Sequence, residues 1–153
     1  MLVYQLTNSR RALDNVSAYQ GVEFAYAVFK NKQLIDNKLM EVDFIKNVSP
    51  EVIEYEEKRV KLCEDYSKKD DTGKPIIEND LYMILDQDTF KGKMEELLNQ
   101  YKPFVEERRR QVELFNQKMN MPVEIQFVKI KKEQIPPQLN TAKDLESISF
   151  MIE

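Results

Sequence analysis

The side chains with the clearest capacity for chemistry lie in two short basic runs in the second half of this sequence. Guanidinium and ammonium groups bind phosphates and carboxylates, so either run could contact nucleic acid or an acidic protein. The candidate partner-contact residues are Arg108, Arg109, Arg110, Lys129, Lys131 and Lys132. Successive helical residues are about 100° apart, so the arginine triplet would spread around a helix and could not form one narrow stripe.

Both basic runs also have a structural explanation. Glu106, Glu107 and Glu113 flank the arginines closely enough to neutralise them on a solvated helix. The lysines lie at the end of a predicted strand, where such residues commonly protect a sheet edge from further pairing. The only aromatic residue near them is Phe127, and base stacking needs several aromatic rings. We therefore favour the structural explanation for both runs and do not expect nucleic acid as a partner.

The acidic residues suggest a search for a metal site, which the sequence does not support. Glu57 and Glu64 lie two helical turns apart on one face, as carboxylate ligands do in some helical bundles. Such sites add a Glu-x-x-His motif, and this chain has no histidine. Asp70 and Asp71 precede Gly73, but the register does not match a calcium-binding EF-hand loop. We expect no metal and no other cofactor.

The sequence offers no catalytic group that stands out. Histidine is absent, the three glycines leave no material for a phosphate-binding loop, and no nucleophile has an identifiable base. Cys63 lies on an apolar helix face, where a buried and inert thiol is the default. The tyrosines and phenylalanines at helical spacing are expected in the core. We therefore expect a protein that is not an enzyme.

Composition is that of an ordinary globular protein. A chain of 153 residues fits a single domain, predicted over 1–153, and is long enough to bury a core. Charged residues make up 33% of the sequence and the net charge is −4, so an anionic membrane or nucleic acid is not a natural partner. No apolar run approaches the roughly 18–20 residues of a membrane span, and none resembles a signal peptide. We expect a soluble protein of the cytoplasm with no membrane partner.

The first half of the chain is predicted to be mainly helical. Leu2–Leu6 is expected as a short strand or extended arm, and a helical pattern covers 8–68. Ser49 and Pro50 suit an N-cap and a first helical position, so the pattern kinks there or, as we favour, breaks into two helices of a long hairpin. A glycine and a proline in the turn at 70–75 end the helical region.

The remainder of the chain, 76–153, is predicted to mix strands and helices. The apolar run Leu81–Leu85 and the alternation in Val123–Ile130 indicate two strands, which Leu2–Leu6 could join. Pro103 should end or kink the helix that carries it. Thr141 begins a pattern similar to a capping box, followed by a last helix. The predicted fold class is α+β, with a long helical hairpin packed with a small two- or three-stranded sheet and further helices.

Three segments, in this order, resemble a known family. Phe24–Asn31 is similar to its aromatic, apolar, Lys-Asn segment, and Arg59–Pro75 is similar to its segment with Arg, Leu, Tyr, Lys-Asp, Gly and Pro. Leu145–Glu153 is similar to its closing helix. The family is a small one of uncharacterised proteins from tailed phages and prophages of Gram-positive bacteria. The resemblance implies a phage protein, encoded among late tail and lysis genes, and implies no catalytic residues.

Together these observations predict a non-enzymatic phage protein that acts through protein–protein contacts, as an assembly factor or minor structural component. The alternative is an inhibitor of a host process, such as an anti-defence protein, because a small acidic protein can occupy a basic site. A weak nucleic-acid binder is the third hypothesis. The expected partner is a phage or host protein, met in the host bacterial cytoplasm or in the virion. A long amphipathic hairpin also favours a homodimer.

Overall fold

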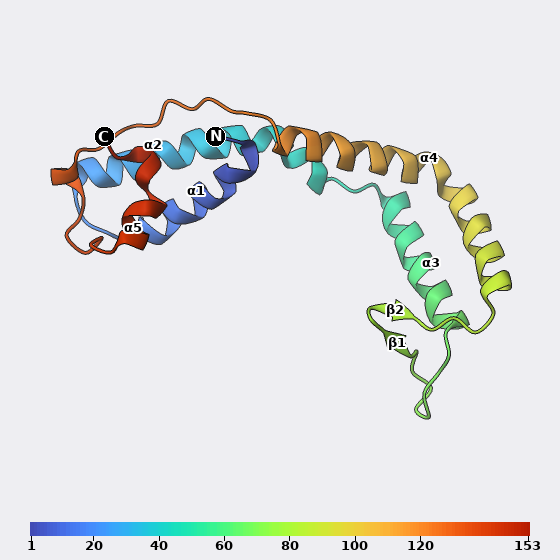
Figure 1. The fold of residues 1–153 in the computed structure, drawn as a ribbon. Coiled ribbons are helices and arrows are strands. Elements are labelled where there is room, and N and C mark those ends of the chain that lie inside the picture. The colour runs from blue at the N-terminus through green and yellow to red at the C-terminus, as the bar shows by residue number, and fades with distance from the viewer. The chain divides into compact units, whose positions relative to one another are not determined.

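The computed structural model describes all 153 residues and divides into two compact units (Figure 1). Unit 1 is built from Met1–Ile45 and Glu113–Glu153, and unit 2 is the continuous stretch Lys46–Val112. The fold class is α+β, as predicted, with helical hairpins and a small two-stranded sheet. The expectation of one domain over 1–153 stays a prediction. No helix is both long enough and apolar enough to cross a membrane.

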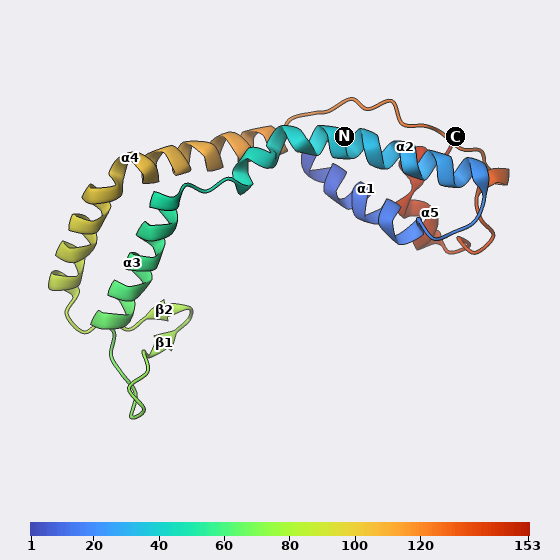
Figure 2. The same ribbon diagram turned by 180° about the vertical axis from the view of Figure 1, so that it is seen from behind.

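The frame of unit 1 is a helical hairpin of α1 (Val3–Val16) and α2 (Val22–Leu39). The two helices lie side by side in both views (Figure 1 and Figure 2). Gly21 joins them with a φ of 131°, a backbone conformation that residues with a side chain avoid. Apolar residues three or four positions apart give each helix one buried face. The core formed between these faces contains Leu6, Leu13, Val16, Phe24, Ala27, Val28 and Ile35.

The expectation of a strand or extended arm at Leu2–Leu6 is wrong. Helix α1 begins at Val3, five residues before the predicted helical region. Leu6 is fully buried and lies two turns before Leu13 on the same face, so helical geometry adds it to the core. The Gln5 side chain accepts a hydrogen bond from the Leu2 amide at 2.7 Å and so caps the first turn.

Four charged side chains connect α1 to α2. Arg10 Nε donates to Asp36 Oδ1 at 2.7 Å, and Arg10 Nη1 lies 2.5 Å from Asp14 Oδ1. Lys32 Nζ lies 2.6 Å from the same Asp14 oxygen. The Arg10 guanidinium, and after it the Lys32 ammonium, lower the pKa of Asp14 from its ordinary 3.8 to about 2.

These ion pairs should make the helical hairpin sensitive to acid. Because the pKa of Asp14 is lower in the folded state, the unfolded state takes up the proton first, and the stabilisation is lost as the pH falls from about 4 to about 2. We expect the protein to have a higher thermal midpoint than Asp14→Asn at neutral pH, and the difference to vanish at about pH 2. Thermal unfolding followed by circular dichroism tests this, and a difference that is independent of pH would contradict it.

The segment Val123–Ile130 is extended but is not the predicted sheet strand. It is held at three points instead of along a ladder. Val123 N donates to Met1 O at 2.8 Å, and Ile130 N donates to Met151 O at 2.8 Å. Between them, the Asn31 side chain of α2 donates to Val128 O at 2.9 Å and accepts from Val128 N at 2.8 Å. A buried amide thus takes the place of a neighbouring strand.

The C-terminal segment completes the core of unit 1 with short helices. They are η2 (Lys132–Gln134), α5 (Ala142–Ser147) and η3 (Ser149–Met151). The predicted capping box is confirmed, since Thr141 Oγ1 accepts from the Asp144 amide at 3.2 Å and Asp144 Oδ2 accepts from the Thr141 amide. The residues that this segment adds to the core are Ile130, Leu139, Ile148 and Met151.

The first helix of unit 2 is α3 (Pro50–Tyr66), which follows the 3-10 helix η1 (Met40–Lys46). Ser49 is its N-cap, with the hydroxyl oxygen accepting from the Val52 amide, and Pro50 takes the first helical position as predicted. The chain therefore breaks at Pro50, and α2 and α3 belong to different units. The helical pairs of this fold are α1 with α2 and α3 with α4.

Helix α4 (Gln87–Met119) continues through Pro103, where the sequence predicts an end or a kink. Proline lacks the amide that would bond to the carbonyl four residues earlier. Pro103 is exposed, so water can satisfy that carbonyl and the helix does not have to end. Of the two predicted outcomes, an end of the helix at Pro103 is therefore wrong, and a kink there stays a prediction.

The core of unit 2 is small. The rings of Tyr55 and Tyr101 lie 6.0 Å apart between α3 and α4, and Leu97 packs against them. Lys58 Nζ donates to the Tyr101 hydroxyl at 2.7 Å and lies 2.7 Å from Glu54 Oε1. Few other apolar side chains take part, so the packing of these two helices depends strongly on Tyr101.

A turn and a β-hairpin connect α3 to α4. The predicted turn at 70–75 is confirmed: Asp70 Oδ1 accepts from the Thr72 amide at 2.8 Å and the Lys74 amide at 3.0 Å, and Gly73 has a φ of 82°. Strands β1 (Ile77–Glu78) and β2 (Leu81–Tyr82) then form the antiparallel sheet.

The predicted strand Leu81–Leu85 is only partly formed, because β2 ends at Tyr82. Two residues with positive φ, Asn79 and Asp80, make the tight turn before it, and this type of turn matches the twist of a hairpin. Directly beyond β2, Met83 N still donates to Ile76 O at 3.0 Å. The chain then bonds to the end of α3, where Leu85 N donates to the Tyr66 carbonyl at 3.0 Å.

Candidate functional site

The structure distributes the predicted arginine triplet around α4. Arg110 pairs with Glu107 at 3.1 Å, and Arg108 Nη1 donates to Gln111 Oε1 at 3.3 Å. Arg109 is exposed. Two of the three guanidinium groups thus contact side chains of their own helix, which is typical of a solvated surface. The triplet forms no single basic patch.

The predicted lysines are used for local contacts. Lys129 Nζ donates to Phe150 O at 2.7 Å, and the Lys131 amide donates to Gln134 Oε1 at 2.8 Å. Lys132 borders a pocket. The expectation that these lysines protect a sheet edge is wrong, because Val123–Ile130 belongs to no sheet. The lysines lie in unit 1 and the arginines in unit 2.

The acidic residues considered as metal ligands are dispersed. No three side chains of the types that bind metals come together in the chain. Glu54 pairs with Lys58, and Glu56 lies 2.8 Å from Arg59. The Cys63 thiol is buried, as predicted.

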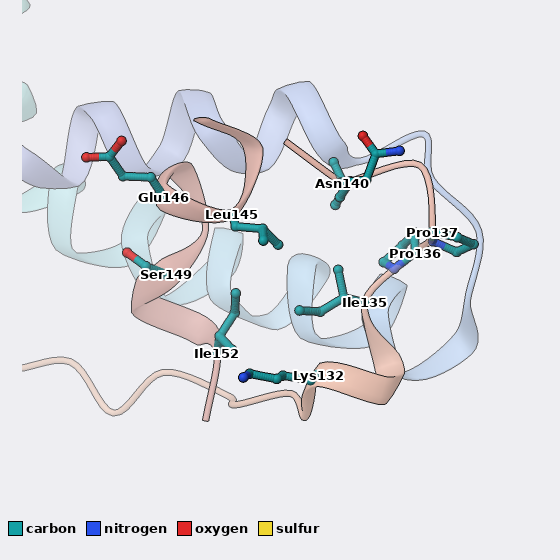
Figure 3. Close-up of a pocket in the computed structure, with 10 residues that line it drawn as sticks. Lys132, Ile135, Pro136, Pro137, Asn140, Leu145, Glu146, Ser149 and Ile152 are labelled. Atoms are coloured by element: carbon teal, nitrogen blue, oxygen red, sulfur yellow. The ribbon is translucent and has the colours of Figure 1, made fainter. Parts of the chain in front are cut away.

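A pocket of about 780 Å³ lies in the C-terminal part of unit 1 (Figure 3). Ile135, Leu145 and Ile152 point into the same space, while the carboxylate of Glu146 points away from it (Figure 3). The pocket is lined by Lys132, Ile135, Pro136, Pro137, Leu139, Asn140, Leu145, Glu146, Ser149 and Ile152. This lining suits an apolar group and brings together no acid and base that could transfer a proton.

The first of two exposed apolar surfaces lies on the β-hairpin of unit 2. Leu81, Met83 and Leu85 are 69%, 41% and 72% exposed, whereas the residues that alternate with them, Tyr82 and Ile84, are half-buried. Successive residues of an extended chain point to opposite sides. One side is therefore covered by unit 2 and the other is uncovered. We call the row Leu81, Met83 and Leu85 the hairpin face.

Acidic residues surround the hairpin face. Glu78 lies directly across the sheet from Leu81, Asp80 precedes it, and Asp86 follows Leu85. The pKa of Asp86 is lowered by hydrogen bonds, chiefly from the Thr89 hydroxyl, so this carboxylate stays charged. Lys68 also lies close to the face, since its amide donates to Met83 O at 2.6 Å.

The second exposed apolar surface lies on α2. Val22, Tyr26 and Phe29 are 82%, 55% and 55% exposed, and their spacing places them on one side of the helix, opposite its buried residues. Lys30 Nζ lies 5.9 Å from the Tyr26 ring centre and 5.8 Å from that of Phe29. We call Val22, Tyr26 and Phe29 the α2 face.

A pocket of about 330 Å³ adjoins the α2 face. Its lining includes Val22, Tyr26 and Lys129, with Glu23 as the acidic member. The expectation that aromatic residues at helical spacing belong to the core is therefore wrong for Tyr26 and Phe29. The pocket and the rings form a surface that can accept an apolar side chain beside two ammonium groups.

Each face has a signal in the sequence. Leu81–Leu85 has five apolar residues in succession, although a short hairpin strand with one side in water should alternate with polar residues. Helix α2 has apolar residues around most of its circumference, more than one buried stripe requires.

Comparison with known proteins supplies no relative for this arrangement. No protein-family model, curated protein or solved structure matches the chain. The two faces must therefore be interpreted from their own chemistry.

Proposed function

We propose that this chain is a non-enzymatic phage protein that works through contacts with other proteins, as an assembly factor or a minor structural component. The hairpin face is the observation that supports this most. An extended segment that is apolar on both sides is normally covered on both sides. Here Leu81, Met83 and Leu85 form an uncovered row with charged residues around it, a composition typical of protein contact sites.

The phage origin depends on the three segments that resemble a phage family. One of them contributes to the α2 face, and a second contributes to the turn before the β-hairpin. Phe24–Asn31 contains two residues of the α2 face and the buried amide that holds Val128, and Arg59–Pro75 ends in the turn before β1. The resemblance therefore covers residues with identifiable structural roles.

An inhibitor of a host protein is the second candidate, favoured by the acidic residues around the hairpin face. Glu78, Asp80 and Asp86 would be repelled by nucleic acid and attracted by the basic site that binds it. Both candidates use the same face and differ in the partner.

Affinity capture from infected host cells separates the two candidates. We expect the tagged chain to retain phage structural proteins. The double variant Leu81→Ser/Leu85→Ser should reduce the amount of captured phage protein, and this reduction should be at least ten times that caused by Leu114→Ser. Leu114 is an exposed leucine of α4 outside both faces and serves as the matched control. If only host proteins are retained and purified virions lack the chain, the assembly proposal is contradicted and the inhibitor is supported.

A further inference from the structure

The hairpin face and the α2 face have complementary chemistry. The first is an apolar row bordered by three carboxylates, Glu78, Asp80 and Asp86, against one lysine, Lys68. The second is an apolar helix surface bordered by two lysines, Lys30 and Lys129, against one carboxylate, Glu23. Contact between them would cover apolar area on both sides and set carboxylates opposite ammonium groups, which favours both association and orientation.

Contact between two like faces, one from each of two copies of the chain, is less favourable. Two hairpin faces would bring acidic residues against acidic residues, and two α2 faces would bring Lys30 and Lys129 against each other. Like charges across an interface cost free energy and suppress that pairing. The symmetric dimer that the helical hairpin suggests is thus disfavoured at these surfaces, whereas pairing of unlike faces is favoured.

We infer that a second copy of this chain covers the hairpin face with its α2 face. The inference rests on the proposed function, since it names the partner of the same hairpin face. In such a pair, the first copy keeps its α2 face free and the second copy keeps its hairpin face free, so further copies can add at both ends. Because the two surfaces in contact differ, the same contact can repeat from one copy to the next. The copies then form either a closed ring or an open filament. The two faces are small compared with the roughly 800 Å² per partner of a stable complex, so the contact is weak and depends on concentration.

Sedimentation velocity on the purified full chain tests this inference. We expect the mean mass to rise with concentration from the 18.2 kDa of one chain to beyond two chains. At about 1 M salt, where charges more than about 3 Å apart are screened, the association constant should fall roughly tenfold. A mass that stays at 18.2 kDa at every concentration overturns the inference, and so does a dimer that still forms when either face is removed by substitution.

Mixing two variants gives the decisive result. Leu81→Ser/Leu85→Ser removes the hairpin face, and Tyr26→Ser/Phe29→Ser removes the α2 face. All four residues are exposed, and unchanged thermal midpoints will show that both variants are folded. Each variant alone should be monomeric, because it retains one face without its complement. The mixture should form a complex of one copy of each and no larger species.

The outcomes also separate this inference from the proposed function. If the mixture forms no complex, or if Leu114→Ser abolishes association as the face variants do, the inference is wrong. Capture of a phage protein that still depends on Leu81 and Leu85 would then support the proposed function alone. If the face variants change neither self-association nor capture, both are wrong.

Discussion

Asn31→Leu should lower the free energy of unfolding by roughly 3 kcal/mol. The Asn31 side chain is fully buried, donates to Val128 O and accepts from Val128 N. Leucine is of similar size but leaves both backbone groups without a partner, and each unsatisfied group that is shielded from water costs about 1–3 kcal/mol. For a chain of this length, the thermal midpoint should fall by roughly 6–12 °C. Urea unfolding and thermal unfolding followed by circular dichroism measure both quantities.

Two controls make the Asn31 experiment specific. Asn116→Leu changes an exposed asparagine of α4 and should alter stability by no more than about 0.5 kcal/mol. Asn31→Asp keeps an acceptor for Val128 N but places a charge against Val128 O, so it should destabilise as well. Hydrogen exchange should show lost protection of the Val128 amide in Asn31→Leu, which has no acceptor for it. Full protection of that amide in Asn31→Leu would mean that the amide side chain does not hold the extended segment.

Tyr101→Ala should have the largest effect in unit 2, a loss of about 3–5 kcal/mol. Tyr101 is buried, contacts Tyr55 and Leu97, and accepts a hydrogen bond from Lys58. Because the core of unit 2 is small, this loss is comparable with the whole stability that such a core can supply. We expect rapid hydrogen exchange throughout α3 in this variant.

Tyr101→Phe is the matched control for the Tyr101 prediction. It retains the ring contact with Tyr55 and removes only the hydroxyl that accepts from Lys58 Nζ. The expected loss is about 0.5–1.5 kcal/mol, the net value of one hydrogen bond. Equal effects of the two substitutions would show that the hydrogen bond, and not the packing of the ring, dominates.

Features that depend on neighbouring residues could be predicted from the sequence. Ser49 and Pro50 start α3, Asp70 and Gly73 build the turn, and Thr141 caps α5 as expected. In each case the interacting groups lie within four positions of each other. Local chemistry then determines local structure with little help from the rest of the chain.

Features that depend on distant partners could not be predicted in the same way. The alternation in Val123–Ile130 correctly indicates an extended backbone, but its partner at Val128 is a side chain 97 positions away. Leu2–Leu6 is too short for its own pattern to distinguish a strand from the first helical turns, and its burial against α2 decides in favour of the helix.

The candidate site was predicted from charge, and the structure draws attention to apolar residues instead. Consecutive arginines and lysines are conspicuous in a sequence, yet Arg108 and Arg110 contact side chains of their own helix, and the Lys129 ammonium donates to the Phe150 carbonyl. An exposed leucine or tyrosine is conspicuous only when the burial of its neighbours is known. Leu85 and Tyr26 could therefore be assigned to a surface only after the buried sides of the hairpin and of α2 had been identified.

The division of the chain into an interrupted and a continuous unit has a consequence for synthesis on the ribosome. Unit 2, Lys46–Val112, can fold as soon as it has emerged. Helices α1 and α2 emerge earlier but must wait, because Ile130, Ile148 and Met151 belong to their core. Helices α1 and α2 are thus translated before unit 2 but covered after it, and until Met151 has emerged they expose apolar surface that chaperones, or neighbouring nascent chains, can bind.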